Sequence, residues 1–263
     1  MNTENFIKTY YSDTYDEDAR FQIDKAHRLE FLTTVRYIDK YLKPNDKILE
    51  IGAGTGAYSL HYAKQGYQVE ALELVERNID IFKSKITPDL SANVAQGNAL
   101  DLSRYADNSF DMTLSLGPLY HLFTNEDRKK AISEALRVTK PGGFLYIAYL
   151  TNDSIIANYF LRKKHIDELP SSIANDTYRL ADKPDKVFIG YHIDEFEKLV
   201  NLPNYEKLHS VATDSIGNLL REFIDELTEE QFKIWVDYHF AVCERPDLQG
   251  YSPHILYIGK KKL

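Results

Sequence analysis

Apolar and polar positions along the first half of the chain follow two different periods. Short apolar runs, typical of buried strands, are separated by longer stretches in which apolar residues recur at helical spacing. The helical stretches are predicted at residues 59–65, 76–86 and 128–138. The apolar runs predict strands at residues 47–51, 68–72, 92–96, 111–115 and 144–150. Strands that alternate with helices in this order predict an α/β fold with a doubly wound, mostly parallel sheet.

The two ends of the chain follow this rhythm less regularly. Residues 1–20 predict an irregular arm, and apolar spacing over 21–42 predicts a helix that leads into the first strand. Beyond residue 150 we expect an inserted, partly helical segment at 152–186 with turns at Pro170 and Pro184, a helix at 192–200, a strand at 206–213, a helix at 219–240 and an edge strand at 254–261.

Nothing in the sequence marks a second domain. The chain has no internal repeat, low-complexity tract or Gly/Ser linker. We therefore expect residues 1–263 to form one domain in three parts. Residues 1–43 are a helical lid or lead-in, 44–150 are the cofactor-binding core, and 151–263 hold the insertion and the remaining strands.

Composition narrows the possible partners. Acidic residues outnumber basic ones by 40 to 32, for a net charge of −8, which disfavours nucleic acid as the main partner. The only cysteine, Cys243, excludes an internal disulfide and fits a reducing cytoplasm. The amino-terminal stretch has no apolar signal core, and no later run approaches the length of a membrane span. We therefore expect a cytoplasmic protein that is not inserted in a membrane.

Glycines at alternate positions follow the first strand. Gly52, Gly54 and Gly56 come between the run KILEI and the next helical stretch. Glycine adopts positive φ without strain and lets a ligand lie directly on the backbone. Amides at the start of the following helix are expected to face the same ligand, which favours a cofactor with hydroxyl, carboxylate or phosphate groups. The alternative is a loop that needs glycines only for its own shape.

Two polar residues at later strand ends support a nucleoside ligand. Glu73 directly follows the second apolar run, where a carboxylate can accept both hydroxyls of a ribose; Glu70 and Glu76 are the competing acids. Asn98 follows the third strand, where its amide can read an adenine edge. However, GAGTGA at 52–57 also fits the dinucleotide pattern, so the turn alone leaves a nicotinamide cofactor open.

Several segments, in their order and spacing, resemble the class I S-adenosylmethionine-dependent methyltransferases. The resemblance covers roughly residues 30–150. Within this family, the chain is similar to the small bacterial type 11 or 25 group. The resemblance implies S-adenosylmethionine as cofactor, S-adenosylhomocysteine as product, and a seven-stranded sheet whose last strand is antiparallel. The segments are LEIGAGTG with Glu50, the acid Glu73, GNALDL at 97–102, SFDMTLSLGPLYHL at 109–122 and EALRVTKPGGFLYI at 134–147.

The resemblance also implies roles for individual residues. It places Gly52, Ala53 and Gly54 against the methionine part of the cofactor, with Glu50 ordering their loop. Glu73 takes the ribose hydroxyls. The remaining implied contacts are Leu74, Asn98 and Ala99 at the adenine, and Leu116 and Gly117 beside the sulfonium. Many relatives carry Asp at the position of Asn98, which here keeps hydrogen bonding and loses a charge.

Catalytic residues are less well defined by the sequence. His121, just past the fourth strand, is the candidate base if the acceptor is a hydroxyl, because histidine titrates near neutrality. A packing role for His121 is the alternative, and Tyr120 and Tyr149 are candidate pocket residues. Two interpretations are open for Tyr10, Tyr11, Tyr15 and Arg28. They form a lid over the cofactor, or they occupy surface and packing positions.

The spacing of the histidines, including His192 and His239, does not indicate a metal site, and we propose no metal. Cys243 is isolated and is expected to be buried rather than nucleophilic. The segment Gly117–Tyr120 lacks the Asn/Asp-Pro-Pro-aromatic motif of enzymes that methylate nucleic-acid bases at nitrogen.

The leading hypothesis is therefore a methyltransferase that acts on an O or N atom of a small molecule. An NAD(P)-dependent oxidoreductase and a non-catalytic nucleoside-binding module are the alternatives. RNA or protein as acceptor, and the oligomeric state, stay open.

Overall fold

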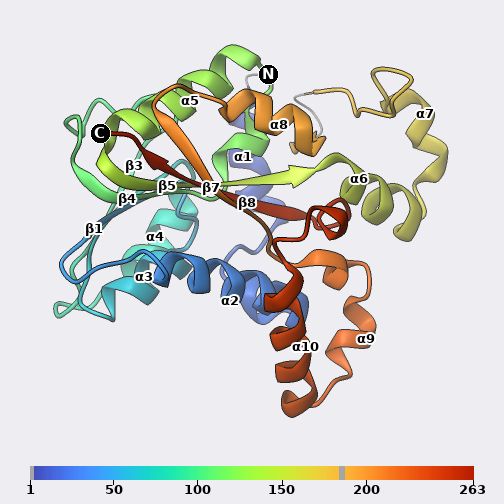
Figure 1. Cartoon of the computed structure of the whole chain (residues 1–263), viewed down its shortest axis with the longest axis horizontal. Coiled ribbons are helices and arrows are strands. Elements are labelled where there is room, and N and C mark those ends of the chain that lie inside the picture. Colours follow the sequence, from blue (N-terminus) through green and yellow to red (C-terminus); the bar gives the residue numbers. More distant parts are fainter. Residues whose placement is uncertain (1–2, 184–186) are drawn as a thin grey trace.

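A mixed sheet of eight strands forms the centre of the computed structural model, which describes residues 3–183 and 187–263 (Figure 1). The strands run in the order β3-β2-β1-β4-β5-β8-β7, and the short β6 pairs with β5 off this path. Their bounds are β1 Lys47–Ile51, β2 Gln68–Glu73, β3 Ala92–Gln96, β4 Phe110–Ser115, β5 Thr139–Thr151, β6 Gly190–Tyr191, β7 Tyr205–Ala212 and β8 His254–Lys261.

Strand direction confirms the predicted fold class. Strands β1 to β6 pair in parallel, whereas β8 runs antiparallel to both β5 and β7. The main path holds the seven predicted strands, and β6 is a two-residue addition. Because β1, β2 and β4 are parallel neighbours, their carboxyl ends meet at one edge of the sheet, which is where α/β proteins bind ligands.

Helices cover both faces of the sheet. Helices α5 (Asn125–Val138) and α8 (Ile193–Val200) lie on one face, and α2 (Lys25–Asp39), α3 (Ala57–Ala63) and α4 (Glu76–Ser84) lie on the other (Figure 1). The apolar sides of α5 and α8 are buried with β4, β5 and β8, and those of α2 and α3 with β1 and β4. Each large apolar side chain buried in these layers contributes about 1.5–3 kcal/mol to stability.

The amino-terminal arm is more ordered than the sequence predicts. Helix α1 (Thr3–Thr9) continues into a π-helical turn, η1 (Tyr10–Thr14), and a 3₁₀ turn, η2 (Arg20–Gln22), precedes α2. The predicted helix over 21–42 begins later, because the Asp24 side chain accepts the backbone N–H of His27 at 2.8 Å and caps α2.

Two predictions for the second half of the chain need correction. The predicted helix over 219–240 is two helices, α9 (Arg221–Asp225) and α10 (Glu229–Val242). Thr228 separates them, since it forms a capping box with Gln231 and starts a new helix. Strand β5 begins at Thr139 rather than 144, and an irregularity in its pairing with β4 accommodates the Pro-Gly-Gly segment.

Among the described residues of the insertion after β5, the helices are short. They are α6 (Asn152–Ile155) and α7 (Leu169–Ser172), joined by a π-helical turn, η4 (Ile156–Arg162), and a 3₁₀ turn, η5 (Ile166–Glu168). Pro170 lies in α7 rather than in the predicted turn. The turn predicted at Pro184 and the predicted end of the insertion at Lys186 lie outside the described residues.

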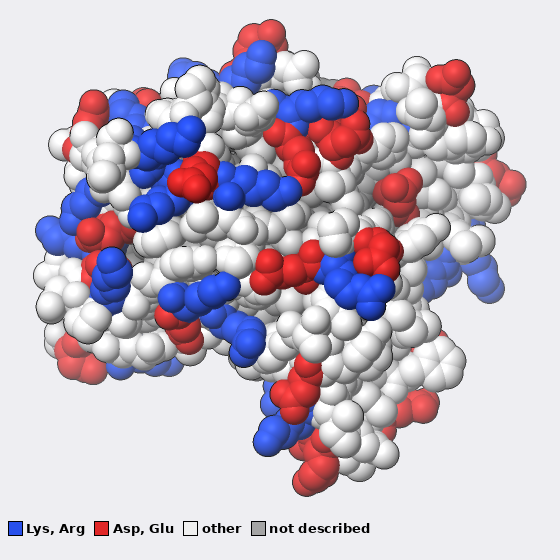
Figure 2. Space-filling view, viewed as in Figure 1, with Lys and Arg blue, Asp and Glu red and all other residues white. Residues whose placement is uncertain are grey.

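Charged side chains of both signs are intermixed over the face of the molecule that Figure 2 shows. Among the described residues, no helix is both long enough and apolar enough to cross a membrane.

Candidate active site

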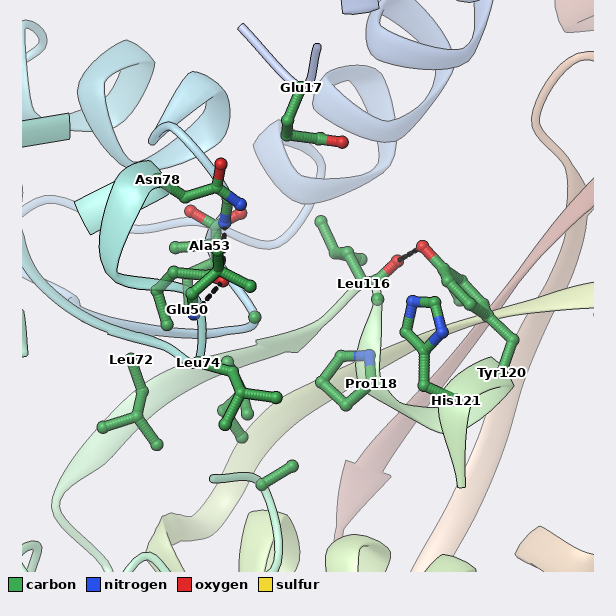
Figure 3. A pocket seen from close by; sticks show the side chains of 18 of the residues that line it. Glu17, Glu50, Ala53, Leu72, Leu74, Asn78, Leu116, Pro118, Tyr120 and His121 are labelled. Atoms are coloured by element: carbon green, nitrogen blue, oxygen red, sulfur yellow. Dashed lines mark hydrogen bonds between the residues drawn. The ribbon is translucent and has the colours of Figure 1, made fainter. Parts of the chain in front are cut away.

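A pocket of about 330 Å³ opens at the carboxyl ends of β1, β2 and β4 (Figure 3). The loop after β1 and the end of β2 form one side of it, and the segment Leu116–His121 after β4 forms the other. The amino-terminal arm covers the pocket with Tyr11, Glu17 and Arg20, and β8 contributes His254. All ten residues predicted to bind cofactor line this pocket, as do Tyr120 and His121.

The loop after β1 has a backbone shape that requires glycine. Gly54 has φ +54°, and a Cβ there would lie 2.9 Å from Cγ of Glu17. Gly56 has φ +85°, and a Cβ would lie 2.5 Å from Cδ2 of Phe82. Both positions combine a left-handed backbone with a close neighbour, so a side chain would be strained and would clash.

Most backbone amides in this loop have partners within the protein. Those of Gly52 and Ala53 donate to the carbonyl of Leu72, and that of Gly54 donates to Glu73. The Ser59 amide, in the first turn of α3, donates to Glu50. The expectation that helix-start amides face the ligand therefore does not hold at Ser59.

Glu73 is the acid that directly faces the glycine loop. It is 6% exposed, and its two oxygens accept the amides of Gly54 at 2.8 Å and Val75 at 2.9 Å. Burial raises the pKa of this carboxyl, and the backbone donors oppose that shift. A carboxylate has about four acceptor positions. The Asn78 side chain and the Leu74 amide also donate to this carboxylate, so a ligand hydroxyl would share or replace one of these donors.

Glu50 lies behind the loop and is 2% exposed. Its Oε2 accepts both the amide and the hydroxyl of Ser59, which ties the end of β1 to α3. Burial raises the pKa of Glu50 to about 8 against the effect of these donors, and the charge of Glu73 adds to the rise.

The predicted adenine side lies at the ends of β2 and β3. Leu74, Asn98 and Ala99 line the pocket there. The side-chain oxygen of Asn98 accepts the amide of Leu100 at 2.9 Å, which orients the amide group. Asn78 of α4 also lines this part of the pocket and is 3% exposed, although no sequence signal identified it.

His121 is buried in an aromatic contact network. Its Nδ1 lies 2.8 Å from the carbonyl of Val187, so this nitrogen donates, and the Tyr11 hydroxyl then donates to Nε2 at 3.1 Å. Burial lowers the pKa of His121 to about 4. The ring is therefore neutral at pH 7 and both of its nitrogens have partners.

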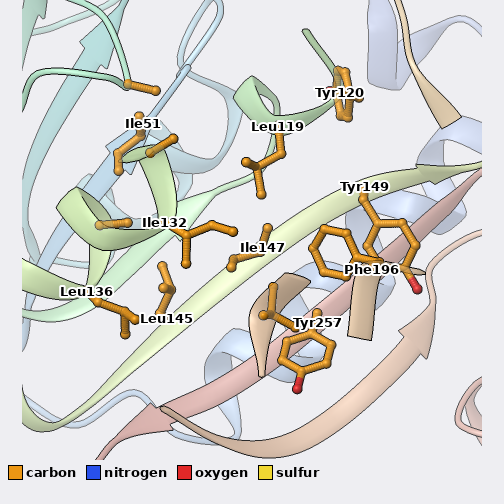
Figure 4. Packing of buried hydrophobic residues seen from close by; sticks show 14 of the residues in the cluster. Ile51, Leu119, Tyr120, Ile132, Leu136, Leu145, Ile147, Tyr149, Phe196 and Tyr257 are labelled. Carbon is orange, nitrogen blue, oxygen red and sulfur yellow. The ribbon is translucent and has the colours of Figure 1, made fainter. Parts of the chain in front are cut away.

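Four of the aromatic and charged candidates, Tyr10, Tyr15, Arg28 and Tyr149, lie away from the pocket lining. Tyr149 is fully buried in the core, with its ring stacked 3.8 Å from that of Phe196 (Figure 4), so its prediction as a pocket residue is wrong. Arg28 forms an exposed ion pair with Glu229, which is a surface position. Tyr10 stacks on Tyr15 behind the lining residue Tyr11.

Several polar residues in the pocket were not predicted. Glu17 and Arg20 come from the arm, Glu30 from α2 and His254 from β8. Arg20 is the only Lys or Arg among the described lining residues, which include six carboxylates. Those are Glu4, Glu17, Glu30, Glu50, Glu73 and Asp127. No local motif signals this group, because its members lie far apart in the sequence.

The fold and the pocket together define an α/β protein with a cofactor site at the carboxyl edge of its sheet. Residues 49–147 match the methyltransferase domain family. Residues 49–147 thus form a methyltransferase domain, and the chain has the fold of solved S-adenosylmethionine-dependent methyltransferases, as the resemblance implied.

Curated relatives match only part of the chain. A demethylmenaquinone methyltransferase of Renibacterium salmoninarum is 40% identical over 106 residues, which are 40% of this chain and 41% of that protein. A probable methyltransferase, ltbC, of Aspergillus luteorubrus is 26% identical over 64% of this chain and 58% of its own. The aligned part is thus about two fifths of the length of the first of these relatives.

Solved structures share the fold over most of the chain. A SAM-dependent methyltransferase of Methanosarcina mazei has a TM-score of 0.56 and 24% identity, and the alignment covers 86% of this chain and 97% of that one. The [4+2]-cyclase SpnF has a TM-score of 0.58 and 18% identity, with 95% and 85% covered. The same fold therefore also occurs in a protein named for a different reaction.

Proposed function

We propose that this protein is a methyltransferase that moves a methyl group from S-adenosylmethionine to an O or N atom of a small molecule. The observation that carries the proposal is the loop Gly52–Gly56 with Glu73 across from it, inside the segment that matches the methyltransferase domain family. Fold alone does not set an activity, so the proposal rests on this site.

The residues present fit the cofactor. Glu73 faces the glycine loop from the end of β2, where ribose hydroxyls can replace the Asn78 side chain as donors to its carboxylate. Gly54 leaves the space under Glu17 that a side chain would fill. Glu50, with a pKa of about 8, is mostly neutral at pH 7. The five other acidic residues still outnumber the single guanidinium among the described lining residues, which favours a donor that carries a sulfonium cation.

The proposed contacts follow from these positions. Gly52, Ala53 and Gly54 lie against the methionine part, with Glu50 holding their loop through Ser59. Leu74, Asn98 and Ala99 would hold the adenine, and Leu116 and Gly117 would lie beside the sulfonium; all five line the pocket. When bound, the cofactor supplies a methyl group on a good leaving group.

The chain then has to align an acceptor atom with that methyl group and exclude water. Positioning of this kind is worth roughly 7–11 kcal/mol. Tyr11 and Glu17 of the arm cover the pocket, and Tyr120 closes its side with a hydroxyl 3.3 Å from the carbonyl of Leu116. Tyr120 and His121 stay candidates for contact with the acceptor.

A small molecule is favoured as acceptor by the shape and charge of the site. The lining residues come from the arm, the sheet edge and β8, so the pocket is closed from several sides. Its acidic lining and the net charge of −8 disfavour a polyanionic acceptor such as RNA. The relatives named demethylmenaquinone methyltransferases also act, by their name, on a small molecule.

Calorimetry with S-adenosylmethionine, S-adenosylhomocysteine and NADH tests the proposal on the whole chain. We expect binding of the first two and none of NADH. Binding of NADH alone would indicate an oxidoreductase. Cofactor binding without methyl transfer to phenols, alcohols or amines, measured as S-adenosylhomocysteine formed, would indicate a non-catalytic module or a different reaction of the same fold.

A further inference from the structure

A buried polar cluster lines the pocket where the arm, α2 and β8 meet. His254, the first residue of β8, contacts Asp214, which precedes the 3₁₀ turn η7 (Ser215–Asn218). Glu30 of α2 and Arg20 of the arm complete the cluster. Asp214 is 2% exposed, whereas the side chain of His254 is 14% exposed and lines the pocket.

Hydrogen bonds in this cluster define the state of the imidazole. Oδ2 of Asp214 lies 3.3 Å from Nδ1 of His254, and its Oδ1 accepts from the Ser252 hydroxyl at 2.7 Å and the His254 amide at 3.2 Å. A carboxylate only accepts, so Nδ1 carries the proton. In the neutral ring, Nε2 consequently presents its lone pair, to which Arg20 donates at 3.2 Å.

Tyr120 connects His254 to the loop that is predicted to lie beside the sulfonium. The Tyr120 hydroxyl lies 3.3 Å from the carbonyl of Leu116, and the Tyr120 ring centroid is 6.3 Å from that of His254. One aromatic side chain therefore spans the distance from the loop beside the sulfonium to the imidazole.

We propose that His254 is the base that takes the proton from the methyl acceptor, and that Asp214 is its positioning residue. This inference rests on the proposed methyltransferase function. The acceptor O–H bond breaks, its proton moves to Nε2 of His254, and its electron pair forms the bond to the methyl carbon. The electron pair of the C–S bond stays on sulfur, and the proton later passes from the imidazolium to water.

Arg20 stays with Glu30 during this exchange. Its Nη2 lies 2.7 and 3.0 Å from the two oxygens of Glu30, so an acceptor hydroxyl replaces it only as the donor to Nε2. The guanidinium then lies beside the oxygen on which negative charge develops.

The surroundings of His254 suit a base better than those of His121. Burial lowers the pKa of His254, and the charge of Arg20 lowers it further. The charge of Glu30, together with the hydrogen bond and the charge of Asp214, raises the pKa by more than this, so that it lies above its ordinary value. Tyr120 also faces the ring. His121 has a pKa of about 4, and Tyr11 donates to its Nε2.

A metal ion is the competing interpretation of Glu30, Asp214 and His254, whose ligand atoms lie within 4.8 Å of one another. The guanidinium of Arg20 already supplies a positive charge to this group, and it contacts both Glu30 oxygens and Nε2. A divalent cation would be repelled by it. Methyl transfer should therefore be unchanged by EDTA.

Nitrogen NMR of the histidine rings tests the proposal without any acceptor. In the wild-type chain with ¹⁵N-labelled histidine, we expect the pKa of His254 to lie above its ordinary value, and the neutral ring, observed above that pKa, to carry its proton on Nδ1. Asp214→Asn should lower that pKa by about 1 or more, because a neighbouring negative charge is lost. A proton on Nε2, or a pKa unchanged in Asp214→Asn, would overturn the proposal.

Methyl transfer from S-adenosylmethionine to pyrocatechol and tyramine gives the second readout. His254→Asn keeps a donor toward Asp214 and lacks the base, so the rate should fall about 100-fold or more at pH 7. This loss of rate should become smaller as the pH rises, because the phenol then ionises without a base. The control is His165→Asn, since His165 forms a His–carboxylate pair with Glu168 on the surface.

The outcomes separate the two hypotheses. If neither S-adenosylmethionine nor S-adenosylhomocysteine binds, the proposed function fails. If both bind and His254→Asn transfers methyl at the wild-type rate from pH 6 to 9, or only His121→Asn is inactive, the base is not His254. If the wild type transfers methyl to neither probe, the NMR result decides.

Discussion

The two sides of the pocket are built in different ways. On the cofactor side, Gly54 and Glu73 belong to adjacent strand ends, and hydrogen bonds join them within one βαβ unit. On the acceptor side, Arg20, Glu30 and His254 come from the arm, α2 and the last strand. The first side is a local structure that a nucleotide can use, whereas the second exists only after the whole chain has folded.

The largest effect should follow from breaking the acceptor side. Arg20→Met leaves Glu30 buried without its cation, which should lower the free energy of unfolding by about 3–5 kcal/mol. Arg28→Met removes an exposed pair with Glu229 and should cost less than about 1 kcal/mol. Urea denaturation of both variants measures the difference. Equal losses would mean that the cluster does not hold the arm in place.

A comparable effect is expected on the cofactor side. Gly56→Ala forces a side chain onto φ +85° and into the Phe82 ring, so it should cost roughly 2–5 kcal/mol. Gly66 has φ +90°, but nothing lies within 4 Å of the position that a Cβ would take. Gly66→Ala should therefore lower the free energy of unfolding only by the backbone strain, about 1–2 kcal/mol. Chemical denaturation compares the two. A loss at Gly56 no larger than that at Gly66 would contradict the close packing of the loop.

His121 should make stability depend on pH. Its folded pKa of about 4 lies below the ordinary 6.5, so below pH 6.5 the unfolded chain binds more protons and stability falls until pH 4. The full loss is about 3 kcal/mol, since one pKa unit is about 1.4 kcal/mol.

His121→Asn should remove this loss while the similar contribution of buried His239 remains. Unfolding free energies of wild type and variant at pH 7, 5.5 and 4.5 measure it. Parallel curves for the two proteins would show that His121 is not held neutral.

The sequence predicted the cofactor side because its signals are local. Strand, glycines and Glu73 follow each other within one βαβ unit, and each carries a pattern of its own. The family match at 49–147 covers the same part. The fold class was also predictable, since it depends on the alternation of strands and helices.

The acceptor side was not predictable in this way. Asp214 and His254 are joined by pairing of β7 with β8, and Arg20 reaches them only because η2 precedes the capped start of α2. The position of His121 after β4 predicted a base. Burial, however, keeps its ring neutral, and the Tyr11 hydroxyl donates to its Nε2. The proton affinity of a histidine depends on neighbours in space that lie far apart in the sequence.

Binding of S-adenosylhomocysteine to Glu73→Gln and Glu70→Gln tests the assignment of the cofactor side most directly. Glu70 lies on the same strand but pairs with Asn93, away from the glycine loop. Calorimetry should show wild-type affinity for Glu70→Gln and about 100-fold weaker binding for Glu73→Gln, because hydrogen bonds to a charged group are worth about 1.5–3 kcal/mol each. Equal affinity of a folded Glu73→Gln and the wild type would contradict the assignment of the ribose, and with it the cofactor, to this loop.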